Sequence, residues 1–137
     1  MQEVDLNRYS QFVEGVTSGA SNDLTTFMNR LDDVDQSDAF INVPLALTAS
    51  IGLAGETGEF AEIIKKIMFH GKPYNEELRA HMAKELGDII WYWTNACRAL
   101  DLDPNQVIAD NVAKLEARYP GGKFDVFHSE NRKEGDI

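Results

Sequence analysis

The chain has 137 residues, 43% of them hydrophobic, and this length and composition suit one compact domain, residues 1–137, with its own core. Its 23 acidic residues outnumber its 13 lysines and arginines, and the formal net charge of −10 argues against a nucleic-acid polymer as partner. A single cysteine, Cys97, excludes an intramolecular disulfide, and the lack of a leader pattern or of an apolar window of about 18 residues predicts a soluble, cytoplasmic protein without a membrane partner.

Two amphipathic helices are predicted in the first third of the chain. The first spans about residues 5–17, with Asp5 as its N-cap, and residues 18–21 interrupt the pattern. The second runs from about residue 23 to residue 31. The acidic run 32–38 is expected to be a solvated helix end and loop, because it lacks the glycine and the spaced glutamate of a calcium-binding loop.

A long third helix is predicted from its cap, Asn42, to residue 69, because apolar residues recur at helical spacing over this stretch. Three glycines fall inside it: Gly52, Gly55 and Gly58. A glycine inside a helix costs about 1 kcal/mol relative to alanine, so the three suggest close packing, a kink or room for a ligand. Gly71 is expected to end the helix.

Two more helices complete the pattern. The fourth is predicted from its cap, Asn75, to residue 100, with Cys97 as a small core residue. The fifth starts at its cap, Asp103, and runs to about residue 118, and residues 121–137 are expected to form an extended or partly mobile tail. No strand pattern competes, so the sequence predicts an all-α fold with a four-helix-bundle core, an additional helix and a C-terminal tail.

Two pairs of acids lie inside these apolar helical patterns. Glu56 and Glu59 form one pair, Glu85 and Asp88 the other, and the three-residue step leaves each pair about 60° apart on its helix. Four acids on core-facing helices repel one another, so a fold keeps them together mainly when a cation lies between them. Periodicity alone leaves a metal site and a solvated acidic surface both open. The register is open too, because Glu62 lies three residues beyond Glu59.

The chemistry of these ligands favours Mg²⁺, or Mn²⁺, over iron. Hard divalent cations prefer carboxylate and water oxygens. Di-iron bundles use Glu-x-x-His elements, in which the two ligands are three residues apart, whereas His81 is four residues from both Glu77 and Glu85. If the acids form a metal site, we therefore expect magnesium in it.

Three segments carry a family resemblance: residues 52–59 (GLAGETGE), 84–92 (KELGDIIWY) and 111–120 (NVAKLEARYP). In this order they resemble the MazG-like family of all-α nucleoside triphosphate pyrophosphohydrolases. The resemblance covers about residues 43–120, and residues 131–136 are similar to the tail of short, phage-borne members. It implies hydrolysis of a nucleoside triphosphate to the monophosphate and pyrophosphate, with Mg²⁺ bound by Glu56, Glu59, Glu85 and Asp88.

The resemblance also implies roles in catalysis and phosphate binding. A carboxylate would orient or deprotonate the attacking water, with Glu59 as the first candidate and Glu62 as its rival. Asn111, Lys114 and Arg118 share one face of the fifth helix. By spacing alone this face would be a solvated edge, and with the resemblance we expect it to contact phosphates.

Lys84 and Trp91 are further candidates for substrate contact. Lys84, with Lys65 and Lys66, could assist phosphate binding, although surface and helix-dipole roles explain these lysines equally well. Trp91 could stack on a base or ribose, although aromatic residues on helices more often belong to the core.

The preferred hypothesis is therefore an enzyme that removes pyrophosphate from (d)NTPs and acts on deoxynucleotide pools. One alternative is hydrolysis of guanosine tetraphosphate, which the wider family suggests. The other is a non-catalytic helical interaction module whose acids only solvate its surface. The long apolar helices favour association with further copies of the chain, and the resemblance implies a homodimer or homotetramer.

Overall fold

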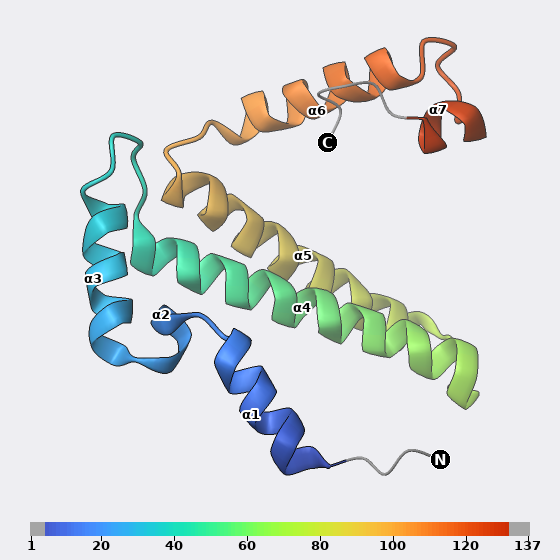
Figure 1. Cartoon of the computed structure of the whole chain (residues 1–137). Coiled ribbons are helices and arrows are strands. Elements are labelled where there is room, and N and C mark those ends of the chain that lie inside the picture. Colours follow the sequence, from blue (N-terminus) through green and yellow to red (C-terminus); the bar gives the residue numbers. More distant parts are fainter. Residues whose placement is uncertain (1–4, 132–137) are drawn as a thin grey trace. The chain divides into compact units, whose positions relative to one another are not determined.

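The computed structural model describes residues 5–131, and all secondary structure in this range is helical (Figure 1). The helices are α1 (Leu6–Val16), α2 (Gly19–Asn22), α3 (Leu24–Asp35), α4 (Val43–His70), α5 (Glu76–Ala99), α6 (Pro104–Arg118) and α7 (Val126–Glu130). The predicted all-α class is confirmed. The tail motif at 131–136 lies outside the described residues, apart from Asn131.

The chain divides into two compact units, Met1–Val43 and Pro44–Ile137. In the first unit, the Asp5 side chain caps α1 as predicted, because it accepts the backbone N–H groups of Asn7 at 3.0 Å and Arg8 at 3.2 Å. The single domain over 1–137 stays a prediction.

Two details of the first unit differ from the sequence prediction. The single-turn helix α2 occupies most of the predicted interruption at residues 18–21 and ends at Asn22, and α3 continues beyond residue 31 to Asp35. The acids Asp32, Asp33 and Asp35 extend α3 without burying charge, because none of the three is buried. The helix then ends where the Gln36 N–H donates to the Asp32 carbonyl at 3.0 Å.

In the second unit, α4 and α5 form an antiparallel helical hairpin (Figure 1). Both helices end within a residue or so of their predicted bounds. Gly71 has a φ of 68°, a left-handed conformation that favours glycine, and the next N–H, of Lys72, donates to the Lys66 carbonyl at 3.1 Å. The Asn75 side chain caps α5 by accepting the Leu78 N–H at 2.9 Å.

Gly52 brings the two long helices close together. A Cβ at this position would overlap the ring of Tyr92 on α5, so only glycine fits here without a shift of the ring. Cβ atoms at Gly55 and Gly58 would meet nothing within 4 Å. Of the three predicted reasons for these glycines, close packing therefore applies at Gly52 and open space at the other two.

The buried side chains of the second unit are few and small or medium in size. They come from the hairpin: Ala49, Ile63, Leu78, Glu85, Asn95, Cys97 and Ala99. The prediction that Cys97 is a core residue is confirmed. Among the described residues, no helix is long and apolar enough to cross a membrane.

The last two helices both begin at an aspartate cap. Asp103 accepts the Asn105 N–H at 2.9 Å and Pro104 follows it, as predicted for α6. Asp125 accepts the His128 N–H at 2.9 Å and starts α7. The segment after residue 120 was expected to be extended or partly mobile. For residues 126–130 the extended alternative is wrong, because they form a helix whose local cap compensates for the weak apolar pattern.

Candidate metal centre

Three carboxylates meet where α4 and α5 face each other. Glu56 and Glu59 on α4 and Glu85 on α5 each offer an oxygen atom, and these atoms lie within 4.8 Å of one another. Glu85 is buried, Glu56 is partly buried and Glu59 is exposed. Both members of the first predicted pair therefore lie close to Glu85 of the second, and Glu59 is the exposed member of this group.

The hairpin explains why these acids meet. Glu56 and Glu59 lie on neighbouring turns of α4, and α5 runs antiparallel beside them from its cap at Asn75. Glu85 is then opposite both. Next to the three acids is a hollow of about 290 Å³, lined by Gly55, Gly58, Glu59, Glu62, Ile63, Lys66 and His81.

It is unfavourable for all the carboxyl groups of the cluster to be ionised at the same time. Partial burial raises the pKa of Glu56, and the negative charges of Glu59, Asp88 and Glu85 raise it further. A hydrogen bond between the Glu56 and Glu85 carboxyl groups acts in the same direction. Carboxylate oxygens that repel one another in this way suit a hard divalent cation such as Mg²⁺ or Mn²⁺. The residues present thus fit such an ion.

Asp88, the fourth predicted ligand, is exposed and lies outside the group of three close oxygens. Its charge still contributes to the raised pKa of Glu56. Asp88 is therefore a neighbour of the cluster, and its role as a ligand stays a prediction.

Glu62 has a different environment from the three clustered acids. Its carboxylate forms ion pairs with Lys65 and, at 3.4 Å, with Lys66. The hydrogen bond from Lys65, together with the charge of that lysine, lowers the pKa of Glu62. On the register question, the close group contains Glu56 with Glu59, while Glu62 lines the adjoining hollow. Its role as a base stays a prediction.

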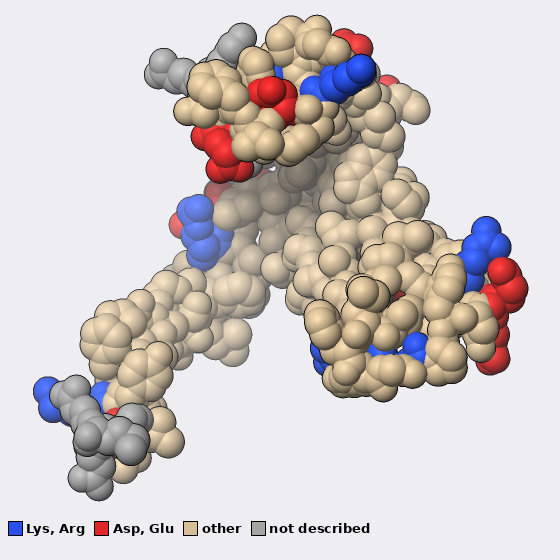
Figure 2. Space-filling view, turned by 90° about the vertical axis from the view of Figure 1, so that its right-hand side faces the viewer, with Lys and Arg blue, Asp and Glu red and all other residues tan. Residues whose placement is uncertain are grey.

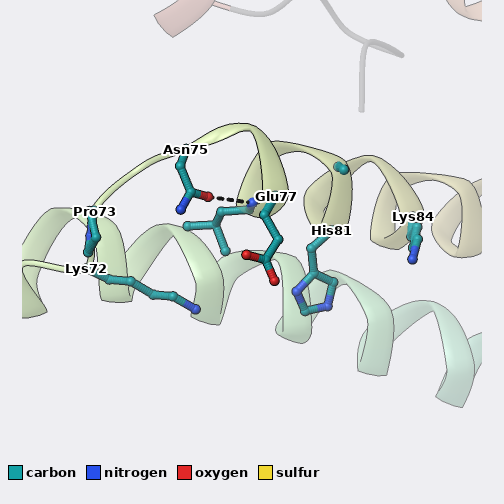
Figure 3. Close-up of a pocket in the computed structure, with 8 residues that line it drawn as sticks. Lys72, Pro73, Asn75, Glu77, His81 and Lys84 are labelled. Atoms are coloured by element: carbon teal, nitrogen blue, oxygen red, sulfur yellow. Dashed lines mark hydrogen bonds between the residues drawn. The ribbon is translucent and has the colours of Figure 1, made fainter.

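Lys84 lies at a second hollow, of about 440 Å³, near the start of α5 (Figure 3). The other residues lining it are Lys72, Pro73, Asn75, Glu77, Leu78, Ala80 and His81. His81 borders both this hollow and the one beside the acids. The two hollows thus share the side chain of His81, and Lys84 lines the hollow near the start of α5 while Glu59 lines the other.

The predicted substrate residues of α5 and α6 occupy mixed positions. Trp91 is 58% exposed, with its ring edge-on to Tyr92 at a centroid distance of 4.8 Å. Asn111 lines an apolar hollow of about 460 Å³ together with residues of α4 and α5. Lys114 is exposed and Arg118 is partly buried. Contact of these four residues with a substrate stays a prediction.

One contact at the cluster was not predicted from the sequence. The Nε2 atom of His81 lies 2.8 Å from Oε1 of Glu85. The signal in the sequence was the four-residue spacing, which places two helical side chains on the same face one turn apart. The same spacing differs from the Glu-x-x-His element of a di-iron centre.

A sequence model of the MazG nucleotide pyrophosphohydrolase domain matches residues 46–122. The chain belongs to this family. The MazG match includes α5, α6 and nearly all of α4, and hence the three clustered acids and Asp88. The family resemblance read from the sequence is confirmed, and its boundaries agree within a few residues.

A curated relative comes from a bacteriophage. The chain is 35% identical over 74 residues to the "Gene 37 protein" of Mycobacterium phage L5. This alignment covers 53% of the chain and 65% of the phage protein, so the chain spans just under two thirds of the relative that it matches. A search of solved structures gave no match.

Proposed function

We propose that this MazG protein is a Mg²⁺-dependent nucleoside triphosphate pyrophosphohydrolase, which converts a (d)NTP to the (d)NMP and pyrophosphate. The observation that carries the proposal is the group of three carboxylates, Glu56, Glu59 and Glu85, with oxygens within 4.8 Å of one another inside the MazG match. Such a group is costly to keep together without a cation, and a nucleotide polyphosphate normally reaches a protein with Mg²⁺.

The metal-binding residues would be Glu56, Glu59 and Glu85, with Asp88 as the outer member. When bound, Mg²⁺ or Mn²⁺ would supply positive charge that offsets the charge of the triphosphate and of its reacting phosphate. The buried Glu85 would give the site a fixed wall, and the exposed Glu59 would leave one side open for the substrate.

Glu59 is the first candidate for the residue that orients or deprotonates the attacking water. Its exposed carboxylate borders a hollow large enough for several waters, and no added Cβ at Gly55 or Gly58 would meet an atom within 4 Å. Glu62 borders the same hollow, but Lys65 and Lys66 already neutralise it. A carboxylate engaged by two lysines is a weak base, which supports Glu59 over Glu62.

Cationic and polar side chains around the cluster would bind the rest of the substrate. Lys84, Lys114 and Arg118 would contact phosphate oxygens. Asn111 would add an amide, and the exposed face of Trp91 would stack on the base or ribose. Asn111 is supported by its place at an otherwise apolar hollow formed with α4 and α5, which resembles the lining of a small-molecule pocket.

The setting of the reaction is also part of the proposal. The enzyme would act on deoxynucleotide pools, and the similarity to a phage protein supports the cytoplasm of an infected host as its location. A homodimer or homotetramer is supported by large apolar side chains that are exposed on the helical hairpin, such as Ile51 at 72% and Ile90 at 60%. In the view of Figure 2, lysine, arginine, aspartate and glutamate side chains occupy the smaller part of the visible surface.

The test is a product assay with Mg²⁺ and a panel of NTPs and dNTPs, read by ³¹P NMR or ion-exchange chromatography. We expect monophosphate and pyrophosphate from the wild type and none from Glu85→Gln. Diphosphate and phosphate would contradict the proposal. Turnover of guanosine tetraphosphate alone would favour the alarmone alternative. No turnover together with unchanged Mg²⁺ affinity in Glu85→Gln would leave a helical interaction module.

A further inference from the structure

His81 and Glu85 face each other one turn apart on α5, and their separation of 2.8 Å is that of a hydrogen bond. The partners differ in exposure, because 56% of the His81 side chain is accessible and only 8% of the Glu85 side chain. Figure 3 shows the imidazole projecting from α5 toward α4. The contact thus joins an accessible ring to the most buried acid of the cluster.

This geometry differs from that of an ordinary surface ion pair on a helix. Arg79 and Glu76 form such a pair on the same helix at 3.1 Å, and their side chains are 68% and 87% exposed. Water competes with both partners of that pair, so its orientation has little effect on either group. At Glu85 little water competes, and a partner that fixes one oxygen also fixes the plane of the carboxylate.

We propose that His81 is a positioning residue for Glu85. Its Nε2–H donates to the carboxylate and holds it in the orientation that brings an oxygen of Glu85 close to the oxygens of Glu56 and Glu59. The inference rests on the proposed metal-dependent function, because it assigns the group that orients one ligand of that site. A neutral imidazole with its proton on Nε2 is sufficient, since that tautomer already donates to Oε1.

The contact is of the kind found just outside the ligands of a protein metal site, where a hydrogen-bond donor orients a ligand. Ligating carboxylates are commonly fixed by a hydrogen-bond donor that does not itself touch the ion, and loss of such a donor typically weakens metal binding by about 10-fold to 100-fold. Glu56 and Glu59 have the charge to bind a cation, and Glu85 has in addition a donor directed at one oxygen. His81 therefore acts through Glu85.

The first experiment measures Mn²⁺ and Mg²⁺ affinity of the full chain by calorimetry, for the wild type, His81→Leu and His81→Gln. We expect His81→Leu to bind Mn²⁺ about 10-fold more weakly or worse, and His81→Gln to recover most of the affinity, because the amide N–H can donate to the same oxygen. Arg79→Leu is the matched control, since it removes an i,i+3 partner of a glutamate on α5, and it should bind as the wild type does.

The second experiment needs no metal. Long-range ¹H–¹⁵N spectra of the metal-free protein report which ring nitrogen of His81 carries the proton. We expect the Nε2–H form in the wild type and loss of this preference in Glu85→Leu. This readout keeps the proposal testable even where His81→Leu fails to fold.

Two results would overturn the inference while the proposed function stands. One is wild-type Mn²⁺ affinity in His81→Leu, and the other is a wild-type His81 protonated on Nδ1 alone. A wild type that binds neither metal would instead refute the proposed function, and this inference with it. The measurements thus separate the two failures.

Discussion

The ring of Tyr92 on α5 fills the space that a Cβ at Gly52 of α4 would need. Gly52→Ala must therefore move the ring or separate the helices. We expect a net loss of up to about 2 kcal/mol in the free energy of unfolding, which is the difference between an overpacking cost of about 1–3 kcal/mol and a gain in helix propensity of about 1 kcal/mol. Urea unfolding followed by circular dichroism measures it.

The control for this prediction is Gly87→Ala on α5. A Cβ there would meet nothing within 4 Å, so the propensity term alone should raise the stability. Equal effects of the two substitutions would show that the approach at Gly52 is not tight in solution.

Stabilisation by Mg²⁺ should depend more strongly on Glu85 than on Asp88. Saturating Mg²⁺ should raise the thermal midpoint of the wild type, because a ligand that binds the folded state stabilises it. We expect Glu85→Gln to abolish this rise and Asp88→Asn to reduce it only in part, since Asp88 is exposed and outside the close group. Glu76→Gln, at an exposed ion pair, is the control and should respond as the wild type does.

In the metal-free protein, Glu56 should make stability depend on pH. Its pKa is raised by partial burial and by neighbouring acids, so the folded chain keeps this proton at pH values where the unfolded chain has lost it. The free energy of unfolding then falls as pH rises from the ordinary glutamate pKa of about 4.3 up through the raised value. Denaturation at several pH values measures the slope.

Glu56→Gln supplies the comparison, because the amide does not titrate. Its stability should vary less than that of the wild type over this pH range, and saturating Mg²⁺ should flatten the wild-type curve. Identical curves for the two metal-free proteins would show that other groups dominate the titration.

Lys114 offers a test of phosphate contact that leaves the acids intact. It is exposed, so Lys114→Met should preserve the fold. Loss of one charge-assisted contact of about 1.5 kcal/mol predicts a KM for the triphosphate about 10-fold higher. Lys123→Met, an exposed lysine in the loop after α6, is the matched control. A KM equal to that of the wild type would assign Lys114 to a solvated edge.

Trp91 should report nucleotide binding by fluorescence. In Trp93→Phe it is the remaining tryptophan, and its side chain is 58% exposed. Stacking of a base should quench its emission when a nucleotide with a non-hydrolysable α,β-bridge is added with Mg²⁺. Retained emission at a saturating concentration, established by calorimetry, would mean that Trp91 does not contact the base.

The sequence was informative about the fold where local chemistry determines the structure. Asp5, Asn75 and Asp103 each cap the helix predicted to follow, because a capping side chain needs only its neighbours two or three residues on. A local cap alone does not predict a helix when few residues follow it. The Asp125 cap that begins α7 is not predictable in this way, because only five residues follow in the helix and their apolar pattern is too short to recognise.

The candidate site was predictable only in part. The spacing of Glu56 with Glu59 and of Glu85 with Asp88 identified the helix faces, but it could not say which oxygens meet. That depends on how close the two helices lie, and the close approach of Tyr92 to Gly52 across the hairpin is visible only in the folded structure. The His81 contact was missed because its partner's burial arises only when α5 is packed.

The hairpin also predicts where the family can tolerate insertions and deletions. A residue added within 71–75, between the helices, can be absorbed by the connection. A residue added to α5 between Asn75 and Glu85 would rotate Glu85 by about 100° relative to the start of the helix and turn it away from α4. Alignments of functional relatives should therefore place their gaps in the connection and none between the α5 cap and its buried acid.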